Sequence, residues 1–489
     1  HMNQIKKTPS RFKNPIGKFL VYRKSSCINC GKCAEICARK VHVKLGNKML
    51  RPFSNFCTGF ECSESEKMCV KNCPSKALCI GIDPNFAAIG DFRWTSDLII
   101  STWHQAETGS LPDSDIESNC GNSGGGFDRI RIIEQKELSE IQPQSVDMHL
   151  NLNKSNDDRP DLIIDMPIYG GGMSFGSISD NTMIARARVA SAWNTLTCTG
   201  EGGYPPFLYP YDHNMITQVA TGLFGVREDT IQRVRMVEFK YAQGAKPGLG
   251  GHLLGDKVTE AVSMMRESIK GSPLFSPFPF HSVYSIEDHK KHIDWIKHVN
   301  PIAIISAKVS TPTDVEMVAV GSYYAGAHVV HIDGSYGGTG AAPEIAKKNI
   351  AMPIEYAINK THKFLVQEGI RNRITLIASG GIRTAHDIFK SIALGADGVV
   401  IGTAEMVALE CVRCKNCESG RGCARGIATT DPVLSALFTE DWAFNRLYNL
   451  YASLDTQLRK LIANSGLKSA ADLIGRTDLI FHLDYQQNQ

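Results

Sequence analysis

The chain has 489 residues, which is enough for about three domains and for at least one large buried core. Hydrophobic residues make up 43% and charged residues 21%, which excludes a disordered or fibrous protein. The formal net charge of +3 gives no reason to expect a nucleic-acid partner. No apolar run reaches the ~18 residues that a membrane span needs, and no secretory signal opens the sequence. We therefore expect a cytoplasmic protein without a membrane span.

The unusual feature of the composition is its 15 cysteines, which are clustered along the chain. Nine lie between Cys27 and Cys79, and four lie between Cys411 and Cys423. Cysteines separated by only two intervening residues have poor geometry for a disulfide with each other. A cytoplasmic protein also keeps its thiols reduced. Metal or iron–sulfur ligation is therefore the better interpretation.

The first cysteine block has the C-x2-C-x2-C-x3-C spacing of two-cluster ferredoxins, in which the fourth cysteine ligates the other cluster. Its eight expected ligands are Cys27, Cys30, Cys33, Cys37, Cys57, Cys62, Cys69 and Cys73. The crossover pattern assigns Cys27, Cys30, Cys33 and Cys73 to one 4Fe–4S cluster. It assigns Cys37, Cys57, Cys62 and Cys69 to a second one. Zinc fits less well, because its sites usually use two pairs of ligands. The division of the eight ligands between the two clusters stays open, since Ala38 stands where a proline usually follows the fourth cysteine. Cys79 is not needed as a ligand, and we expect it to be a small buried residue.

The middle of the chain alternates short apolar β-branched runs with longer helical segments from about residue 160, after a polar, glycine-rich loop at 108–126. The predicted strands are 162–169, 195–199, 237–242, 303–309, 329–333, 375–379 and 398–401, with a weaker candidate near 273–282. The predicted helices include 256–268, 287–298, 313–325, 343–368 and 384–393. Seven clear strands and one weak strand fit an eight-stranded TIM barrel. A doubly wound sheet fits less well, because no G-x-G-x-x-G follows an early strand.

Glycine-rich segments follow most of these strands. Gly380-Gly381 and Gly402-Thr403 follow the last two strands, where barrel enzymes commonly bind a phosphate at helix N-termini. Lys240 and Lys308 lie inside apolar strands. Each is either a surface lysine with a buried stem or a barrel-interior cation for a group such as a reduced flavin.

The second cysteine block, Cys411, Cys414, Cys417 and Cys423, directly follows the last predicted strand. A cluster at this position would lie beside the mouth of the barrel. Flavin is the natural acceptor there, because it takes single electrons from iron–sulfur centres and delivers a hydride to substrate. The two cysteine blocks and the phosphate site together indicate an FMN enzyme fed by iron–sulfur clusters.

Several motifs resemble the FMN-binding synthase domain of glutamate synthases, over residues 160–432. The matching segments are GMSFG at 172–176, TGEGG at 199–203, AQGAKPG at 242–248, YSIED at 284–288, GGTG at 337–340, and Cys423 followed by GIATTDP at 426–432. With the first cysteine block included, nearly the whole chain resembles the short, archaeal-type form of the family. The resemblance implies an oxidoreductase of ammonia assimilation, which forms L-glutamate from 2-oxoglutarate and ammonia through 2-iminoglutarate.

The resemblance also implies roles for individual residues. Lys246 and Arg266 would pair with the two substrate carboxylates, since charge-assisted pairs give both affinity and orientation. Glu201 would face the imine and assist ammonia or proton handling. His252 is also expected among the catalytic residues. The long synthases have a glutamine at this position, so we expect one substrate contact to differ from theirs. The expected FMN-binding residues are Met173, Ser174, Lys240, Gln243, Lys308, Gly338, Gly380, Gly381, Gly402 and Thr403.

The third cluster and the partners differ from those of the long synthases. The family's 3Fe–4S spacing is altered here by Cys414, so that both a 3Fe–4S and a 4Fe–4S cluster stay open. Leu249 also replaces an acidic residue. Neither a glutaminase domain nor an NAD(P) site is visible in the sequence. We therefore expect a separate ammonia-delivering subunit and an electron donor, either ferredoxin or an NAD(P)H-oxidising subunit.

The expected architecture is α/β, with four parts and a possible homo-oligomeric assembly. The parts are a ferredoxin-like domain at 15–90, a linker and barrel lead-in at 91–159, an FMN-binding (β/α)8 barrel with the third cluster at 160–432, and a short helical extension at 433–489. Two alternative functions remain open. One is a related FMN synthase that uses another amine, of the N-methylglutamate synthase type. The other is a non-catalytic electron-transfer subunit.

Overall fold

The computed structural model describes residues 4–12, 16–59, 62, 68–111, 126–133, 140–340, 342, 344–347, 349–418 and 422–484. The chain divides into two compact units. The barrel unit contains residues 1–8, 102–411 and 415–489, and the N-terminal unit contains residues 9–101 and 412–414. Among the described residues, no helix is both long enough and apolar enough to cross a membrane.

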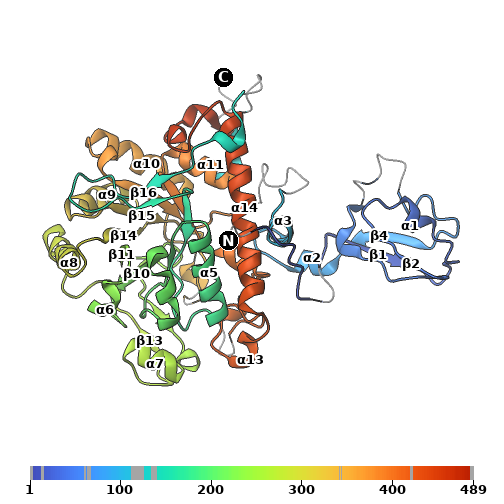
Figure 1. The fold of residues 1–489 in the computed structure, drawn as a ribbon, viewed down its shortest axis with the longest axis horizontal. Helices are drawn as coiled ribbons and strands as arrows, with labels where there is room; N and C mark the ends of the chain where they lie inside the picture. Colours follow the sequence, from blue (N-terminus) through green and yellow to red (C-terminus); the bar gives the residue numbers. More distant parts are fainter. Residues whose placement is uncertain are drawn as a thin grey trace. The chain divides into compact units, whose positions relative to one another are not determined.

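The barrel unit is built on a closed barrel of parallel strands, which confirms the predicted TIM barrel (Figure 1). In barrel order the strands are β8 (Ile168–Gly170), β9 (Thr197–Cys198), β10 (Met215–Ala220), β11 (Met236–Lys240), β14 (Ile304–Ser310), β15 (Val329–Asp333), β16 (Thr375–Ser379) and β17 (Gly398–Ile401). The helices between and after them are α5 (Asp180–Ala192), α6 (Glu228–Ile231), α7 (Glu260–Arg266), α8 (Ile286–Val299), α9 (Val315–Tyr324), α10 (Ile354–Gln367), α11 (Ala385–Leu394) and α12 (Thr403–Ala408).

Two predicted elements are wrong. The weak strand candidate near 273–282 is not part of the barrel, because its Leu274–Phe275 (β13) pairs with His252–Leu253 (β12) in a small hairpin. The missing barrel strand is β10, in which all six residues are buried. The predicted helix 343–368 begins only at Ile354, because Pro353 precedes it and proline cannot continue a helix interior.

Hydroxyl side chains cap the N-termini of five helices in the barrel unit. The N-cap side chain accepts a hydrogen bond from a backbone N–H of the first turn, which would otherwise have no partner. These caps are Ser179 for α5, Thr259 for α7, Ser285 for α8 and Thr384 for α11. The same arrangement starts the long C-terminal helix α14 (Glu440–Asn464) at Thr439.

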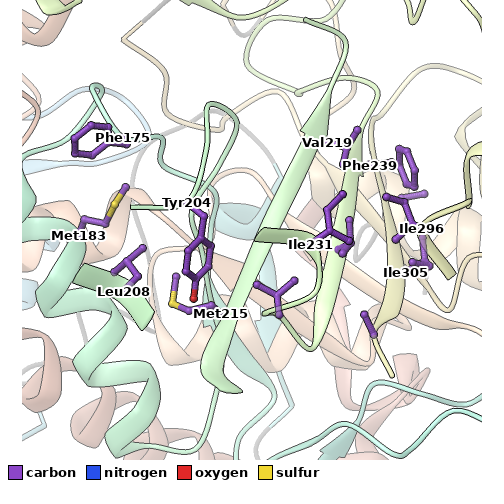
Figure 2. Close-up of a cluster of buried hydrophobic side chains, with 14 of the residues drawn as sticks. Phe175, Met183, Tyr204, Leu208, Met215, Val219, Ile231, Phe239, Ile296 and Ile305 are labelled. Atoms are coloured by element: carbon purple, nitrogen blue, oxygen red, sulfur yellow. The ribbon is translucent and has the colours of Figure 1, made fainter. Parts of the chain in front are cut away.

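Apolar side chains from strands and helices meet in a large core between the barrel wall and its outer layer (Figure 2). Met183 on α5 and Ile296 on α8 pack in the same buried cluster as Phe239 on β11 and Ile305 on β14. Burial of this surface is the main favourable term in folding. The strands are therefore fixed independently of any ligand at their ends.

The segment after the barrel belongs to the same unit. Helix α14, the long red helix in Figure 1, packs against α5 and α11. Residues 433–489 are not helical throughout, because Ile480–His482 (β18) forms an antiparallel pair with Ile130–Ile132 (β5). The chain before the barrel and the chain after it are thus joined by one small sheet.

The N-terminal unit is small and has few regular elements. Strands β1 (Phe19–Arg23) and β4 (Leu78–Ile82) pair antiparallel, and β2 (Lys44–Leu45) pairs with β3 (Lys48–Met49). The helices that begin in this unit are α1 (Lys32–Ile36), α2 (Pro84–Ala88) and α3 (Ser96–Thr108). Its buried cluster consists of Val21, Val41 and Leu78. Five cysteines pack against that cluster, namely Cys33, Cys37, Cys57, Cys69 and Cys73.

Candidate active site

Charged side chains converge at the carboxyl ends of the barrel strands, where barrel enzymes hold their chemistry. Glu201 follows β9, and its Oε2 lies 3.8 Å from Nζ of Lys240 at the end of β11. Lys246 and Lys308 are buried and belong to the same charged group, since both act electrostatically on Glu201. One carboxylate thus faces several ammonium groups.

Arg266, the last residue of α7, adds a buried guanidinium to this group. Its Nη2 donates a hydrogen bond to the Phe175 carbonyl over 3.0 Å. Gly202 makes room for it, because a Cβ at that position would lie only 2.6 Å from the guanidinium carbon. Its Nε is buried and has no hydrogen-bond partner among the described residues. A buried N–H without a partner is costly, which suits a donor that binds a substrate oxygen.

The electrostatics of the group favour an anion. Burial alone would raise the pKa of Glu201, but Lys240, Lys246, Arg266 and Lys308 together lower it below its usual value. Burial, reinforced by Lys240 and Lys308 against the opposing effect of Glu201, lowers the pKa of Lys246 to about 7. The cations outnumber the carboxylate, so an anionic substrate would relieve their mutual repulsion.

His252 lies on the β12–β13 hairpin at the edge of this group. Its ring stacks on Phe275, with ring centroids 4.5 Å apart and an interplanar angle of 12°. The hairpin touches Glu201, because a Cβ on Gly251 would lie 1.9 Å from the Glu201 Oε1. Burial and the Lys246 cation lower the pKa of His252. The structure therefore brings all four expected catalytic residues to one end of the barrel.

The expected FMN-binding residues also lie at strand ends. Met173 and Ser174 follow β8 and contact Gly200, while the Met173 methyl group lies near Gly402. Gln243 Nε2 donates to the Gly338 carbonyl over 3.5 Å. Gly380 and Gly381 follow β16 with φ of 98° and 100°, a conformation that favours glycine, and Thr403 is the first residue of α12.

A buried polar layer inside the barrel was missed by the sequence reasoning. It consists of Gln218, Glu238, Ser306, His331, Asp333 and Ser379, all on barrel strands. The available signal was a polar residue inside each of several otherwise apolar strand segments.

The cysteines of the N-terminal unit form two groups. A hollow at the surface of this unit is lined by Cys27, Cys30, Cys33 and Cys73, together with neighbouring residues. The other group centres on Cys69, whose pKa is raised to about 12 by burial and by neighbouring thiols. Those thiols are Cys57, Cys37, Cys33 and Cys62. Among the described residues, no group of three or more His, Cys, Asp or Glu side chains is arranged to hold a metal ion.

The second cysteine block is divided between the two units. Cys411, Cys417 and Cys423 belong to the barrel unit, whereas Cys414 is grouped with the N-terminal unit. The buried Lys257 donates from Nζ to the Cys417 carbonyl over 2.9 Å. A Cβ on Gly340 would lie 3.3 Å from Sγ of Cys417, so this thiol touches the glycine-rich segment after β15.

The closed parallel barrel, with a carboxylate and four basic side chains at its strand ends, has the architecture of a TIM-barrel enzyme. The family model described as the conserved region in glutamate synthase matches residues 127–468. The chain belongs to this glutamate synthase family. It is accordingly an oxidoreductase acting on CH–NH2 groups, with glutamate synthase activity. The family assignment supports FMN as the cofactor of the barrel.

Relatives of two lengths match the chain. The archaeal-type glutamate synthase (NADPH) of Dehalococcoides mccartyi is 35% identical over 94% of this chain and 94% of that protein. The archaeal glutamate synthase (NADPH) of Methanocaldococcus jannaschii is 42% identical over 65% and 62%. The large chain of glutamate synthase (NADPH) from Azospirillum brasilense is 36% identical over 63% of this chain, but over only 21% of its own length. Among solved structures, a mutant flavocytochrome b2 with pyruvate bound overlaps at a TM-score of 0.47 with 15% identity, over 78% of this chain and 82% of that one.

Proposed function

We propose that this chain is the catalytic subunit of a glutamate synthase, which converts 2-oxoglutarate and ammonia to L-glutamate through 2-iminoglutarate. The observation that carries the proposal is the charge arrangement at the strand ends. The substrate has two carboxylates and one carbonyl that becomes an imine. The site has cations for the first two and a carboxylate for the third.

Substrate binding falls to Arg266 and Lys246. The Arg266 Nε is the buried donor without a partner, and it supplies one charge-assisted hydrogen bond to a carboxylate. Lys246 pairs with the other carboxylate, and in doing so regains the charge that burial disfavours. The two contacts together fix which face of the carbonyl carbon is presented to the barrel.

Glu201 handles protons at the reacting carbon. The surrounding cations keep this carboxylate ionised, so it can accept a proton from attacking ammonia and return one to the leaving oxygen. Lys240, 3.8 Å away, holds the carboxylate in place. Gly251 allows the β12–β13 hairpin to close over it, which limits water at the site.

The residues at the strand ends fit FMN. Gly380 and Gly381 have the open backbone that a phosphate requires, and Gly402-Thr403 starts a helix whose N-terminus favours an anion. Met173, Ser174, Gln243 and Gly338 would line the ring system, with Lys240 and Lys308 as nearby cations. When bound, FMN supplies the hydride that reduces the imine carbon.

The N-terminal unit is proposed to carry two 4Fe–4S clusters. The four cysteines that line its hollow are the expected ligands of the first cluster, Cys27, Cys30, Cys33 and Cys73. The thiols that act on one another around Cys69 include the expected ligands of the second, Cys37, Cys57 and Cys62. Ligands of a cubane stand further apart than ligands of one ion, so a site of this kind does not require three side chains around a point.

A third cluster is proposed beside the barrel, bound by Cys411, Cys417 and Cys423. Contact between Cys417 and the segment at Gly340 supports its position next to the flavin residues. Three thiolates from one unit suit a 3Fe–4S cluster, and addition of Cys414 would suit a 4Fe–4S cluster. An anaerobic count distinguishes them, at about eleven or about twelve iron per FMN in total.

Ammonia and electrons are proposed to come from other proteins. The relatives are named for NADPH, which fits an NADPH-oxidising partner, and a ferredoxin is the other candidate donor. Either would reduce the clusters of the N-terminal unit, from which electrons pass to the barrel. A separate glutaminase subunit would deliver the ammonia.

One observation favours a second candidate, an FMN synthase that aminates with another amine. His252, whose ring stacks on Phe275, directly follows Gly251, which lies against Glu201, so an alkyl group on an amine bound at Glu201 would approach this hairpin. The electron-transfer alternative has no such support, because a relay has no use for the cluster of Glu201, Lys246 and Arg266.

The test is a turnover assay with a chemically reduced one-electron donor, 2-oxoglutarate and ammonia. We expect L-glutamate to form in proportion to protein loaded with FMN and iron. Replacement of ammonia by methylamine should give little product. Faster turnover with methylamine would establish the second candidate, and absence of either product from fully loaded protein would refute both.

A further inference from the structure

The polar layer inside the barrel forms one continuous hydrogen-bonded chain. Glu238 Oε2 lies 2.9 Å from His331 Nδ1, and His331 Nε2 lies 2.6 Å from Ser379 Oγ. Ser379 Oγ in turn lies 2.5 Å from Asp333 Oδ1. All four side chains are at least nine-tenths buried. A carboxylate thus stands at each end of the chain, with a histidine and a hydroxyl between them.

The protons in this chain can be counted. Its three contacts need three hydrogens, because an ionised carboxylate can only accept. Ser379 brings one hydrogen on its hydroxyl, and a neutral imidazole brings one more. The hydrogen-bonded side chains therefore hold one proton more than a neutral His331, a Ser379 hydroxyl and two ionised carboxylates would bring. That proton resides on His331, on Glu238 or on Asp333.

Other contacts favour the histidine. Glu238 also accepts hydrogen bonds from Gln218 and from Ser306, and Asp333 accepts one from the Gly244 backbone N–H over 2.8 Å. These donors stabilise both carboxylates in their ionised form. The ordinary pKa of histidine, about 6.5, is also more than two units above those of aspartate and glutamate.

Lys308 connects these hydrogen-bonded side chains to the charged group at the strand ends. It is buried on β14 directly beside His331 on β15, and Asp333 and Glu238 are the first two groups that stabilise its charge. When His331 is protonated, the positive charges of His331 and Lys308 balance the negative charges of Glu238 and Asp333. Among the described residues, the other titratable groups that interact with the layer or with Lys308 include Tyr169, Cys198, Glu201 and Lys246.

We propose that His331 is doubly protonated in the folded protein and acts as a positioning residue, which keeps Glu238 and Asp333 ionised beside Lys308. Lys308 is thereby held as a cation at the floor of the flavin site. Loss of the His331 charge would leave one uncompensated negative charge there. That charge would oppose the anionic reduced flavin more than the oxidised form. This last step rests on the proposed function, whereas the protonation state does not.

The first experiment measures the protonation state itself. Protein labelled with 15N-histidine, without flavin, is examined by NMR, and the His331 signals are assigned by their loss in His331→Gln. We expect both ring nitrogens to resonate as an imidazolium at neutral pH. A neutral tautomer at neutral pH would overturn the inference.

The second experiment uses a matched pair of hydroxyl deletions. Ser379→Ala breaks the chain between His331 and Asp333, whereas Ser306→Ala removes a donor to Glu238 and leaves all three contacts. We expect the first variant to weaken binding of reduced relative to oxidised FMN by about tenfold. The second variant should leave the imidazolium in place.

Equal effects of the two variants on the ratio of FMN affinities would overturn the positioning role. Failure of the wild-type protein to bind FMN would instead refute the proposed cofactor, and the NMR result would still stand. Because each substitution removes a single hydroxyl from a large core, both variants are expected to fold.

Discussion

The barrel unit and the N-terminal unit hold their functional side chains in different ways. In the barrel unit, Glu201, Lys246 and Arg266 are attached to strands and helices that a large apolar core already fixes. In the N-terminal unit, the cysteines Cys33, Cys37, Cys57, Cys69 and Cys73 themselves pack against the buried cluster of Val21, Val41 and Leu78. The first arrangement preforms its site, whereas we expect the second to depend on the proposed clusters.

The difference follows from size. A large unit buries enough apolar surface to keep several cations near one another, at a cost visible in the lowered pKa of Lys246. We expect the proposed clusters to stabilise the smaller N-terminal unit, because metal-binding free energy becomes folding free energy. We therefore expect site substitutions in the barrel to change activity, and ligand substitutions in the N-terminal unit to change the fold.

The largest effect is expected from Cys73→Ser. Loss of one expected ligand should remove about four iron from the protein and abolish turnover with a physiological donor. Cys79→Ser is the matched control, because Cys79 lies on β4 outside the hollow. Iron and sulfide analysis checks the prediction. Equal iron contents in the two variants would show that Cys73 is no ligand.

A loss of about 10²- to 10⁴-fold in kcat is expected from Glu201→Gln, since an amide cannot accept the proton. Glu260→Gln changes an exposed carboxylate paired with Lys270 and should have almost no effect. Steady-state kinetics with a reduced dye makes the comparison. If the two variants behave alike, proton transfer does not pass through Glu201.

Arg266→Ala is expected to lower kcat/KM for 2-oxoglutarate by about 10²-fold, because it leaves a substrate carboxylate without its partner. Flavin content and unfolding of the N-terminal unit should not change. Arg227→Ala serves as the control, since its ion pair with Asp229 is exposed. An unchanged KM in Arg266→Ala would contradict the proposed substrate contact.

The smallest effect concerns pH. Lys246, with a pKa of about 7, is neutral in the free protein at higher pH, and a bound carboxylate restores its charge. Substrate binding should therefore take up a proton above pH 7, and affinity should fall by about tenfold per pH unit there. Calorimetry in buffers of different ionisation enthalpy measures this uptake. Lys246→Met should abolish it, and uptake that persists in this variant would assign the proton elsewhere.

Strand prediction succeeded where burial shows as a continuous apolar run, as in β17, and failed at β10. Gln218 and Thr217 interrupt that strand, because the barrel interior gives them polar partners that no local pattern reveals. The segment at Leu274–Phe275 had comparable local character, but it pairs with a neighbouring hairpin strand. Local periodicity alone does not distinguish the two.

In the candidate site, too, some features are visible in the local sequence and others depend on tertiary contacts. The resemblance of short motifs such as TGEGG and AQGAKPG to glutamate synthases suggested roles for Glu201, Lys246 and their neighbours. Nothing in the sequence indicated that Glu238, His331, Ser379 and Asp333 would form one chain, because they come from three different strands. Such a contact exists only after the barrel closes.

The sequence by itself determined the β/α alternation, the family, the residues available for chemistry and the two blocks of cysteines, because each depends on local spacing and residue type. The tertiary structure decided which polar residues share the barrel interior, how many cations surround one carboxylate, and which cysteines lie in the same unit. These features depend on side chains that are distant along the chain, and burial brings them together while removing the water that would otherwise screen their charges.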